Sequence, residues 1–410
     1  MKVLVLNSGS SSQKACLYEI GETLPAHPPT PLWEGRIEWG SDTAKISVKN
    51  SQGGVQRESL KVGSREEFVR HLLDTLDAGP ARAIASLSEI DVVGHRVVHG
   101  GPHFEDPVVV TPKVRSAIAD ASTLAPLHIR AELEGMNIVE SLLGPIPQIA
   151  VFDTGFYRQM PLSAQTYPGP YKWLKSGIRR YGFHGINHEY CAGRAAQLLG
   201  KELEALKIVS CHLGNGCSVT GIQGGQSIDT TMGFTPLDGL MMGTRSGSVD
   251  PGILIFLMRE EKLDCEQVDR VLNQESGLLG ISGVSSDMRD ILGAIKQGNE
   301  RAKLAFDIFV HRLRGAVGSM AGVLGGLDVL VFTAGVGENS PDVRAAVCSK
   351  FEFLGLKLDR EANQQTSLDR DIAAADSRVR ILVVRAEEDW AIAGKCWKLA
   401  HASLQVGSRG

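Results

Sequence analysis

The sequence lacks the features that mark several large classes of protein. No apolar run approaches the ~20 residues that a bilayer-spanning helix needs, and the N-terminal run is too short for a signal peptide. No block of lysines and arginines stands out and the net charge is −4, so neither a membrane nor nucleic acid is an expected partner. The seven cysteines contain no C-x-x-C pair, which predicts reduced thiols in a cytoplasmic protein.

Two well-known phosphate-binding loops are also missing. No G-x-x-x-x-G-K-[ST] motif occurs anywhere in the chain. The first turn has one glycine and leads into a strand-like segment, whereas a dinucleotide fingerprint needs three glycines and a helix. Residues 334–339 follow the apolar run 329–332 and come closer to that fingerprint, but they lack the third glycine.

The N-terminal segment nevertheless indicates phosphate binding of another kind. The apolar run 2–7 breaks into the small-residue turn SGSSSQK and becomes apolar again at residues 15–18. A turn without bulky side chains lets N–H groups and hydroxyls approach phosphate oxygens, and Lys14 adds positive charge. An ordinary serine- and glycine-rich hairpin is the alternative interpretation of this segment taken alone.

The same pattern recurs in the middle of the chain. Residues 207–211 are apolar and lead into the turn HLGNGC, which a second β-like segment follows. A shift of 205 positions, half of the 410 residues, places Asn7 on His212 and Gly9 on Gly214. The length allows two or three domains, and 43% hydrophobic with 22% charged residues is ordinary for a globular protein. We therefore expect two related halves.

Alternating β-like and helical segments indicate an α/β protein. Periodicity predicts helices over residues 65–76, 299–323, 341–351 and 389 to about 404, and apolar runs predict strands over 90–98, 146–152, 329–332 and 379–384. Because α/β proteins carry their chemistry at the carboxyl ends of strands, the residues that follow these strands are the candidates for a site.

Two strand ends in the first half carry charge. Arg96, within GHRVVHGG, is suited to hold a carboxylate or phosphate through two parallel hydrogen bonds, although a structural carboxylate is an alternative partner. Asp153 ends the strand near residue 152, where a carboxylate can bind Mg²⁺ or, alternatively, cap a helix.

Two segments in the second half carry basic side chains. In RRYGFHGINH two histidines stand four positions apart, but a zinc site would need this pair on a helix with further ligands, and Gly182 and Gly185 argue against a helix at that point. His184 is therefore interpreted as a polar donor in a pocket and His188 as structural. Arg245 lies in GTRSGSVDPG, a loop too rich in glycine and serine for ordinary packing, and is expected to bind an oxyanion.

Taken together, these segments resemble the acetate kinase family. NSGSSSQK, RYGFHGINH, CHLGNGCS, MGTRSG and VFTAGVGENS occur in the order expected for the family, and the match runs from the first residues to Glu388. The resemblance implies two actin-like ATPase (ribonuclease H-like) domains with mixed sheets flanked by helices and the nucleotide in the interdomain cleft. The first would span residues 1–152, completed by the C-terminal helix 386–410, and the second, residues 153–385, would carry most nucleotide contacts.

The resemblance also implies ATP as substrate, Mg²⁺ or Mn²⁺ as cofactor, a homodimer, and a role for each matching residue. Arg96, Asp153, His184 and Arg245 would be catalytic. Arg96 would also bind the carboxylate substrate, with Val98, Leu127, Phe183 and Pro236 around its methyl group. The metal would lie at Asn7, Asp153 and Glu387, and the nucleotide and its phosphates would contact Asn7, Ser10, Ser12, Lys14, His212, Gly214, Asn215, Gly335, Gly337 and Asn339.

The expected reaction is direct in-line transfer of a phosphoryl group to acetate. An acetate oxygen is already a nucleophile, so catalysis reduces to alignment and neutralisation of charge. The chain departs from the family pattern at Ile129-Arg130, Gly155 with Tyr157, Ser248, and Arg385-Ala386. A propionate kinase with the same mechanism and a non-catalytic nucleotide switch of the actin or chaperone kind are the alternatives.

Overall fold

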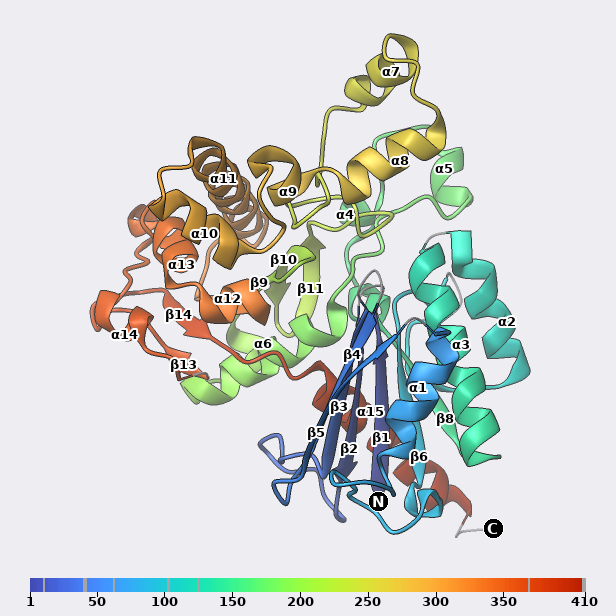
Figure 1. Ribbon diagram of the computed structural model, residues 1–410. Coiled ribbons are helices and arrows are strands. Elements are labelled where there is room, and N and C mark those ends of the chain that lie inside the picture. Colours follow the sequence, from blue (N-terminus) through green and yellow to red (C-terminus); the bar gives the residue numbers. More distant parts are fainter. Residues whose placement is uncertain are drawn as a thin grey trace. The chain divides into compact units, whose positions relative to one another are not determined.

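The computed structural model describes residues 1–9, 12–39, 43–61, 63–101, 104–123, 125–367 and 369–407. The chain divides into two compact units, Met1–Gly155 with Glu387–Gly410 (unit 1) and Phe156–Ala386 (unit 2). Each unit has its own mixed sheet with helices packed on it (Figure 1), which confirms the predicted α/β fold. No helix within these described ranges is both long and apolar enough to cross a membrane.

Unit 1 is built on an eight-stranded sheet in the order β5-β4-β3-β2-β1-β6-β8-β7. The predicted hairpin consists of β1 (Lys2–Ser8) and β2 (Ser12–Glu19). It continues on one side into three antiparallel strands, β3 (Trp33–Trp39), β4 (Thr43–Asn50) and β5 (Val55–Lys61). On the other side of β1 lie two parallel strands and an antiparallel edge strand: β6 (Val92–Val97), β8 (Gln148–Phe152) and β7 (Val108–Val109).

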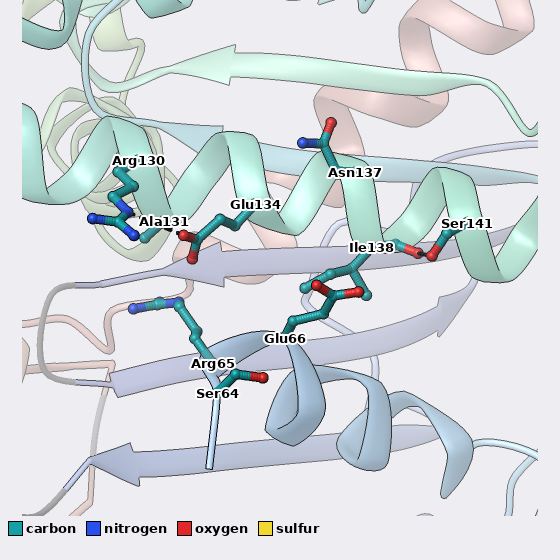
Figure 2. Close-up of a pocket in the computed structure, with 9 residues that line it drawn as sticks. All are labelled: Ser64, Arg65, Glu66, Arg130, Ala131, Glu134, Asn137, Ile138 and Ser141. Carbon is teal, nitrogen blue, oxygen red and sulfur yellow. Dashed lines mark hydrogen bonds and ion pairs between the residues drawn. The ribbon is translucent and has the colours of Figure 1, made fainter.

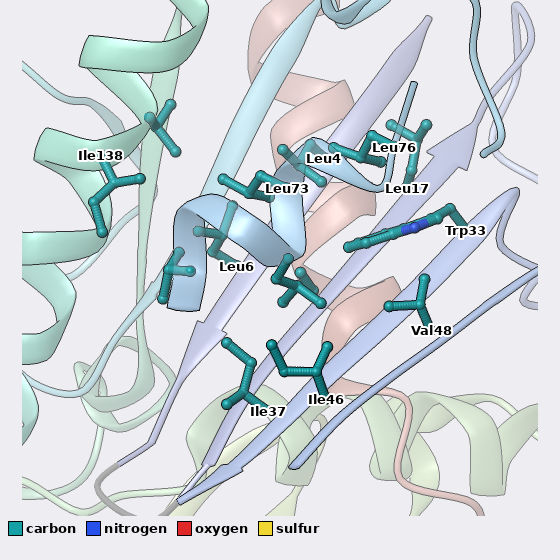
Figure 3. Close-up of a cluster of buried hydrophobic side chains, with 14 of the residues drawn as sticks. Leu4, Leu6, Leu17, Trp33, Ile37, Ile46, Val48, Leu73, Leu76 and Ile138 are labelled. Carbon is teal, nitrogen blue, oxygen red and sulfur yellow. The ribbon is translucent and has the colours of Figure 1, made fainter. Parts of the chain in front are cut away.

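Successive side chains of β1 point to opposite faces of the sheet, so the core of unit 1 has a part on each face. Leu4 and Leu6 are completely buried in a cluster with Leu73 and Ile138 (Figure 3), on the face covered by α1 (Arg65–Asp74) and α3 (Pro126–Leu143). Val5 faces α15 (Glu388–Gly407), because it lies beside Gly94, where any Cβ would meet side chains of that helix. The remaining helix of unit 1 is α2 (Pro112–Asp120).

Unit 2 repeats the strand order of unit 1. Its six-stranded sheet, β11-β10-β9-β12-β14-β13, has the order and directions of β3-β2-β1-β6-β8-β7. The strands are β9 (Lys207–Leu213), β10 (Cys217–Gln223), β11 (Gln226–Thr230), β12 (Val329–Thr333), β13 (Arg370–Asp371) and β14 (Arg380–Val383). The starts of β1 and β9 are separated by the 205 positions that relate the two turns in the sequence.

Two long helices pack on the sheet of unit 2. They are α11 (Glu300–Val323), against β9, β10 and β11, and α6 (Gly185–Leu199), against β9 and β12. The other helices are α4 (Leu162–Gln165), α5 (Lys172–Lys175), α7 (Pro251–Arg259), α8 (Cys265–Gln274), α9 (Gly277–Ser282), α10 (Met288–Lys296), α12 (Ala334–Asn339), α13 (Pro341–Cys348) and α14 (Arg360–Gln364).

The secondary structure differs from the prediction in several details, among them the segment around Gly185 and the end of the helix predicted over 341–351. Gly182 and Gly185 were expected to exclude a helix, but α6 begins at Gly185 and continues through His188. Glycine costs only about 1 kcal/mol relative to alanine in a helix, and tertiary packing readily outweighs this cost. The predicted helix over 341–351 ends at Cys348.

Candidate active site

In unit 1, three parallel strands place polar side chains at neighbouring carboxyl ends. Asn7 lies in β1, Arg96 in β6, and Asp153 follows β8. Nη2 of Arg96 lies 2.5 Å from Oδ2 of Asp153, and its Nη1 donates to Oδ1 of Asn7 at 3.5 Å. Asp153 is only 1% exposed, so this is a buried ion pair.

The beginning of α15 adds two carboxylates to this group. Nδ2 of Asn7 donates to Oε2 of Glu388 at 3.2 Å and to Oδ1 of Asp389 at 3.1 Å. Burial favours a lower pKa for Arg96, but the charges of Asp153 and Glu388 outweigh it and leave the pKa above its usual value. Arg96 therefore stays charged, and the carboxylates around it outnumber it.

This surplus of carboxylate oxygens suits a hard divalent cation. Mg²⁺ prefers oxygen ligands and is commonly held by one or two carboxylates together with water and substrate phosphates. Within the residues that the structure describes, no group of three or more His, Cys, Asp or Glu side chains could hold a metal by itself. Asp153, close to Asn7 and Arg96, thus fits an ion whose coordination is completed by phosphate and water. Glu387, the other expected carboxylate ligand, is half-buried and directly precedes α15.

The turn between β1 and β2 is held partly by Arg65, a residue that the sequence did not single out. Gly9 N donates to Ser12 O at 2.8 Å, and Arg65 donates through Nη2 to Gly9 O at 3.1 Å. Arg65 also lines a cavity of about 730 Å³ between α1 and α3 (Figure 2), whose lining contains none of the expected site residues. Lys14 is exposed, and the predicted contact Ser10 lies outside the described residues.

In unit 2, three histidines meet between β9, β10 and the start of α6. The rings of His184 and His212 stack with centroids 4.0 Å apart, and Nδ1 of His184 lies 2.9 Å from Oγ of Ser218. His188 is completely buried, with its ring nitrogens 2.9 Å from Oγ of Ser210 and 2.8 Å from Oγ of Ser218. Burial, with the charge of His212, holds the pKa of His188 well below its usual value, so His188 is neutral.

Arg245 is the cation of this second group. Its Nη1 donates to Pro236 O at 3.4 Å, and within the described part of the chain no carboxylate lies at ion-pair distance from it. A Cβ built on Gly216 would lie 3.5 Å from Nε2 of His184 and 3.6 Å from Nη1 of Arg245, so both groups lie around the same glycine. A largely desolvated guanidinium without a carboxylate is suited to an anionic ligand.

The expected nucleotide residues of unit 2 lie at the end of β9, in the turn that follows it and in α12. The turn after β9 approaches the start of α12, since a Cβ on Gly214 would lie 3.9 Å from that of Ala334. Nδ2 of Asn339 donates to Gly335 O at 2.9 Å, and the buried Arg344 donates to Gly337 O at 2.9 Å. Gly335 has open space where a side chain would stand, as close approach of a ligand requires.

The structure thus brings some of the expected residues together, namely Asn7, Arg96 and Asp153 in unit 1 and His184, His212 and Arg245 in unit 2. Val98 follows β6 and is 3% exposed, and Phe183 adjoins His184 in unit 2. The side chain of Leu127 lies outside the described residues. Glu388, Asp389 and Arg65 were missed, and only the acidic start of α15 gave a signal for the first two.

The structure also shows the burial and the hydrogen bonds of residues that depart from the family pattern. Tyr157 is buried, and its hydroxyl donates to Phe183 O at 2.6 Å. Oγ of Ser248 donates to Oδ1 of Asp238 at 2.5 Å, and Ile129 is buried in α3. Ala386 N donates to Oε1 of Glu338 at 2.8 Å. Tyr157 is therefore the departure that directly holds the segment before His184.

Comparison with known proteins gives one consistent family. The family model described as the Acetokinase family matches residues 2–394. An acetate kinase of Trichormus variabilis is 58% identical over 98% of this chain and 100% of its own length. The crystal structure of Porphyromonas gingivalis acetate kinase has a TM-score of 0.88 at 41% identity, covering 97% of this chain and 99% of that one. A propionate kinase from Francisella tularensis also has a TM-score of 0.88, at 36% identity and the same coverage.

Proposed function

The chain belongs to the acetokinase family, and we propose that it transfers the γ-phosphoryl group of ATP to acetate in a reversible reaction that yields acetyl phosphate and ADP. It is a phosphotransferase whose acceptor is a carboxyl group. The proposal is carried by the environment of Arg245. Its guanidinium is largely desolvated, lies beside Gly216 as His184 does, and has no carboxylate partner in the described residues.

We infer that charge neutralisation is the main work of the protein side chains. A phosphoryl group in transfer spreads negative charge over its equatorial oxygens, and guanidinium groups stabilise that charge without proton transfer. Arg245 and His184 would hold these oxygens, and Arg96 would hold the acceptor carboxylate. Because an acetate oxygen is itself the nucleophile, no general base is needed, and in-line alignment supplies much of the rest.

The carboxylates of unit 1 would hold the divalent cation. When bound, Mg²⁺ or Mn²⁺ neutralises phosphate charge and orients the phosphates of ATP. Asp153 and Glu387 would contribute oxygens, with Asn7 close by. Arg96 would then share Asp153 with the ion, which keeps the guanidinium from being fully neutralised by its ion pair.

Residues 153–385 would carry most nucleotide contacts. His212, Gly214 and Asn215 would approach the phosphates, and Gly335, Gly337 and Asn339 would lie near the adenosine; Ser10, Ser12 and Lys14 of the first turn would complete the phosphate contacts. Open space at Gly335 and the hydrogen bond from Asn339 to its carbonyl support this assignment.

The acyl end would lie against Val98, Leu127, Phe183 and Pro236. The carbonyl of Pro236 accepts from Arg245, and Phe183 precedes His184, so these two apolar residues adjoin the charged groups of unit 2. A propionate kinase is the second candidate, because one methylene changes discrimination by only about 1–3 kcal/mol. The likeness to the Francisella tularensis propionate kinase favours testing both acids.

The deciding experiment measures acyl phosphate formation by the purified protein with MgATP and acetate, propionate or butyrate. We expect acetyl phosphate and ADP, and ATP formation from them in the reverse direction. Nucleotide binding without acyl phosphate from any of the three acids would instead favour a non-catalytic nucleotide switch. A higher kcat/KM for propionate would favour the second candidate.

We also propose a cytoplasmic homodimer. The cysteines are all free thiols, as expected in a reducing compartment. Helix α7 exposes a set of large apolar side chains that a second copy would cover: Ile253, Ile255, Phe256 and Met258. The mass of the protein in solution, measured by sedimentation, tests the dimer.

A further inference from the structure

Glu132 is a buried carboxyl group that the mechanism above does not use. It lies in α3 and is 1% exposed, whereas Arg130 and Glu134 of the same helix are solvent-accessible and line the cavity in Figure 2. Oε1 of Glu132 accepts from the N–H of Val98 at 3.0 Å. Oε2 is buried and has no hydrogen-bond partner in the described residues. An ionised carboxylate in this position would leave charge on an unsolvated oxygen, which is costly.

Burial, rather than the balance of the neighbouring charges, disfavours a negative charge on Glu132. The groups within electrostatic range are Arg96 at the end of β6, Asp153 after β8 and Arg65 at the start of α1. Arg96 already has Asp153 at 2.5 Å, so it cannot fully neutralise a second carboxylate. Burial raises the pKa of Glu132 to about 8, although the Val98 N–H, Arg96 and Arg65 each act to lower it.

We propose that Glu132 is a positioning residue of the active site, which fixes the main chain at Val98 through Oε1 and keeps the surroundings of Arg96 free of another negative charge by staying protonated. Val98 is the first residue after β6, and its N–H is bound by this side chain at the point where the strand leads into the expected acyl pocket. The inference rests on the function proposed above. Loss of the proton would weaken the hold of Arg96 on an anionic acceptor.

The first test follows the KM for acetate from about pH 6.5 to about pH 9, a range in which acetate itself stays ionised. Wild type should show a rise of about fivefold to tenfold, the order expected for one added charge near a binding cation in a partly screened site. Glu132→Gln keeps an acceptor for the Val98 N–H but cannot ionise, so its KM should stay flat. The matched control Glu134→Gln should follow wild type, and the same rise in Glu132→Gln would overturn the proposal.

A second variant separates anchoring from charge. Glu132→Ala removes both the proton and the acceptor of the Val98 N–H, so the KM for acetate should be higher than in Glu132→Gln at every pH. Equal KM values for the two variants would contradict the anchoring role of Oε1.

The last test does not depend on activity. The pKa of Glu132 is raised in the folded protein, so its contribution to stability is fully present at acidic pH and is lost as the pH rises toward about 8. The Tm of wild type should therefore fall by several degrees relative to Glu132→Gln between about pH 5 and about pH 9, while Glu134→Gln follows wild type. A Tm difference between wild type and Glu132→Gln that does not change with pH would overturn the proposal about Glu132. If wild type forms no acyl phosphate at all, only the proposed function is overturned.

Discussion

The two units build sites of opposite electrostatic character on the same strand order. In unit 1, the carboxyl ends of β1, β6 and β8 carry Arg96 and Asp153, with Glu388 and Asp389 close by. In unit 2, the end of β9, which corresponds to β1, carries His212, whose ring stacks on that of His184. Arg245, in the segment between β11 and α7, lies around the same glycine as His184 and has no carboxylate partner in the described residues. The topology decides where polar groups gather, and the side chains decide which ion they suit.

This difference predicts that the two arginines respond differently to substitution. Arg96 belongs to a buried ion pair, so removal of either partner leaves an uncompensated charge. Arg245 has no such partner, so its removal leaves no buried carboxylate behind. Substitution of Arg96 or Asp153 in unit 1 should therefore lower both activity and stability. Substitution of Arg245 in unit 2 should lower activity and leave stability nearly unchanged.

The largest expected effect is that of Arg245→Ala. Removing a well-placed cation from a phosphoryl-transfer site should lower kcat by about 10³-fold or more, with the Tm close to that of wild type. Steady-state kinetics and calorimetry measure the two effects. Arg312→Ala is the control, because Arg312 is an exposed arginine of the same unit and should leave kcat unchanged. A large fall in Tm, or a small fall in kcat, would remove Arg245 from its proposed role.

Asp153→Asn should come next and should affect both properties. It weakens the ion pair with Arg96 and removes charge from the cation site, so half-saturation should require roughly tenfold to a hundredfold more Mg²⁺. The unfolding free energy should fall by about 3 kcal/mol, as expected when one partner of a buried pair is lost. Asp120→Asn, at an exposed position of unit 1, controls for the substitution itself. Wild-type Mg²⁺ dependence would exclude Asp153 from the cation site.

Val98→Ala should produce a smaller change, confined to the choice of acid. If Val98 packs on the acyl group, the added space should improve kcat/KM for propionate relative to acetate by up to about tenfold. Val109→Ala, at a half-exposed position of β7, should leave the ratio unchanged. An unchanged ratio in Val98→Ala would place the acyl pocket elsewhere.

The smallest expected effect is that of Tyr157→Phe. Loss of the hydroxyl removes a hydrogen bond to the carbonyl of Phe183, which should lower the unfolding free energy by about 1–3 kcal/mol and shift the KM for acetate by about threefold. Tyr171→Phe, at a side chain exposed to 69%, should do neither. An unaltered Tyr157→Phe enzyme would mean that this departure from the family pattern does not position the segment before His184.

Much of the fold could be predicted because its signals are local. The periodicity of residues 65–76 and 299–323 predicted α1 and α11, and apolar runs predicted β6, β8, β12 and β14. The strands over residues 33–61 were missed, although Ala44, Ile46 and Val48 alternate with polar residues as a half-buried strand requires. Gly185 was misread, because a glycine at a helix start differs little in local sequence from one in a loop.

The sequence by itself determined the family, the two hairpins and the residue types at the strand ends, because motifs and short periodicities depend on neighbours in the chain. The tertiary structure alone decided the partners of the charged groups. Arg96 meets Asp153, 57 positions away, and Asn7 meets Glu388, 381 positions away. Glu132 is buried against Val98, while Glu134 on the same helix is solvent-accessible. Such pairings depend on how sheets and helices pack, and packing joins segments whose local sequences carry no information about one another.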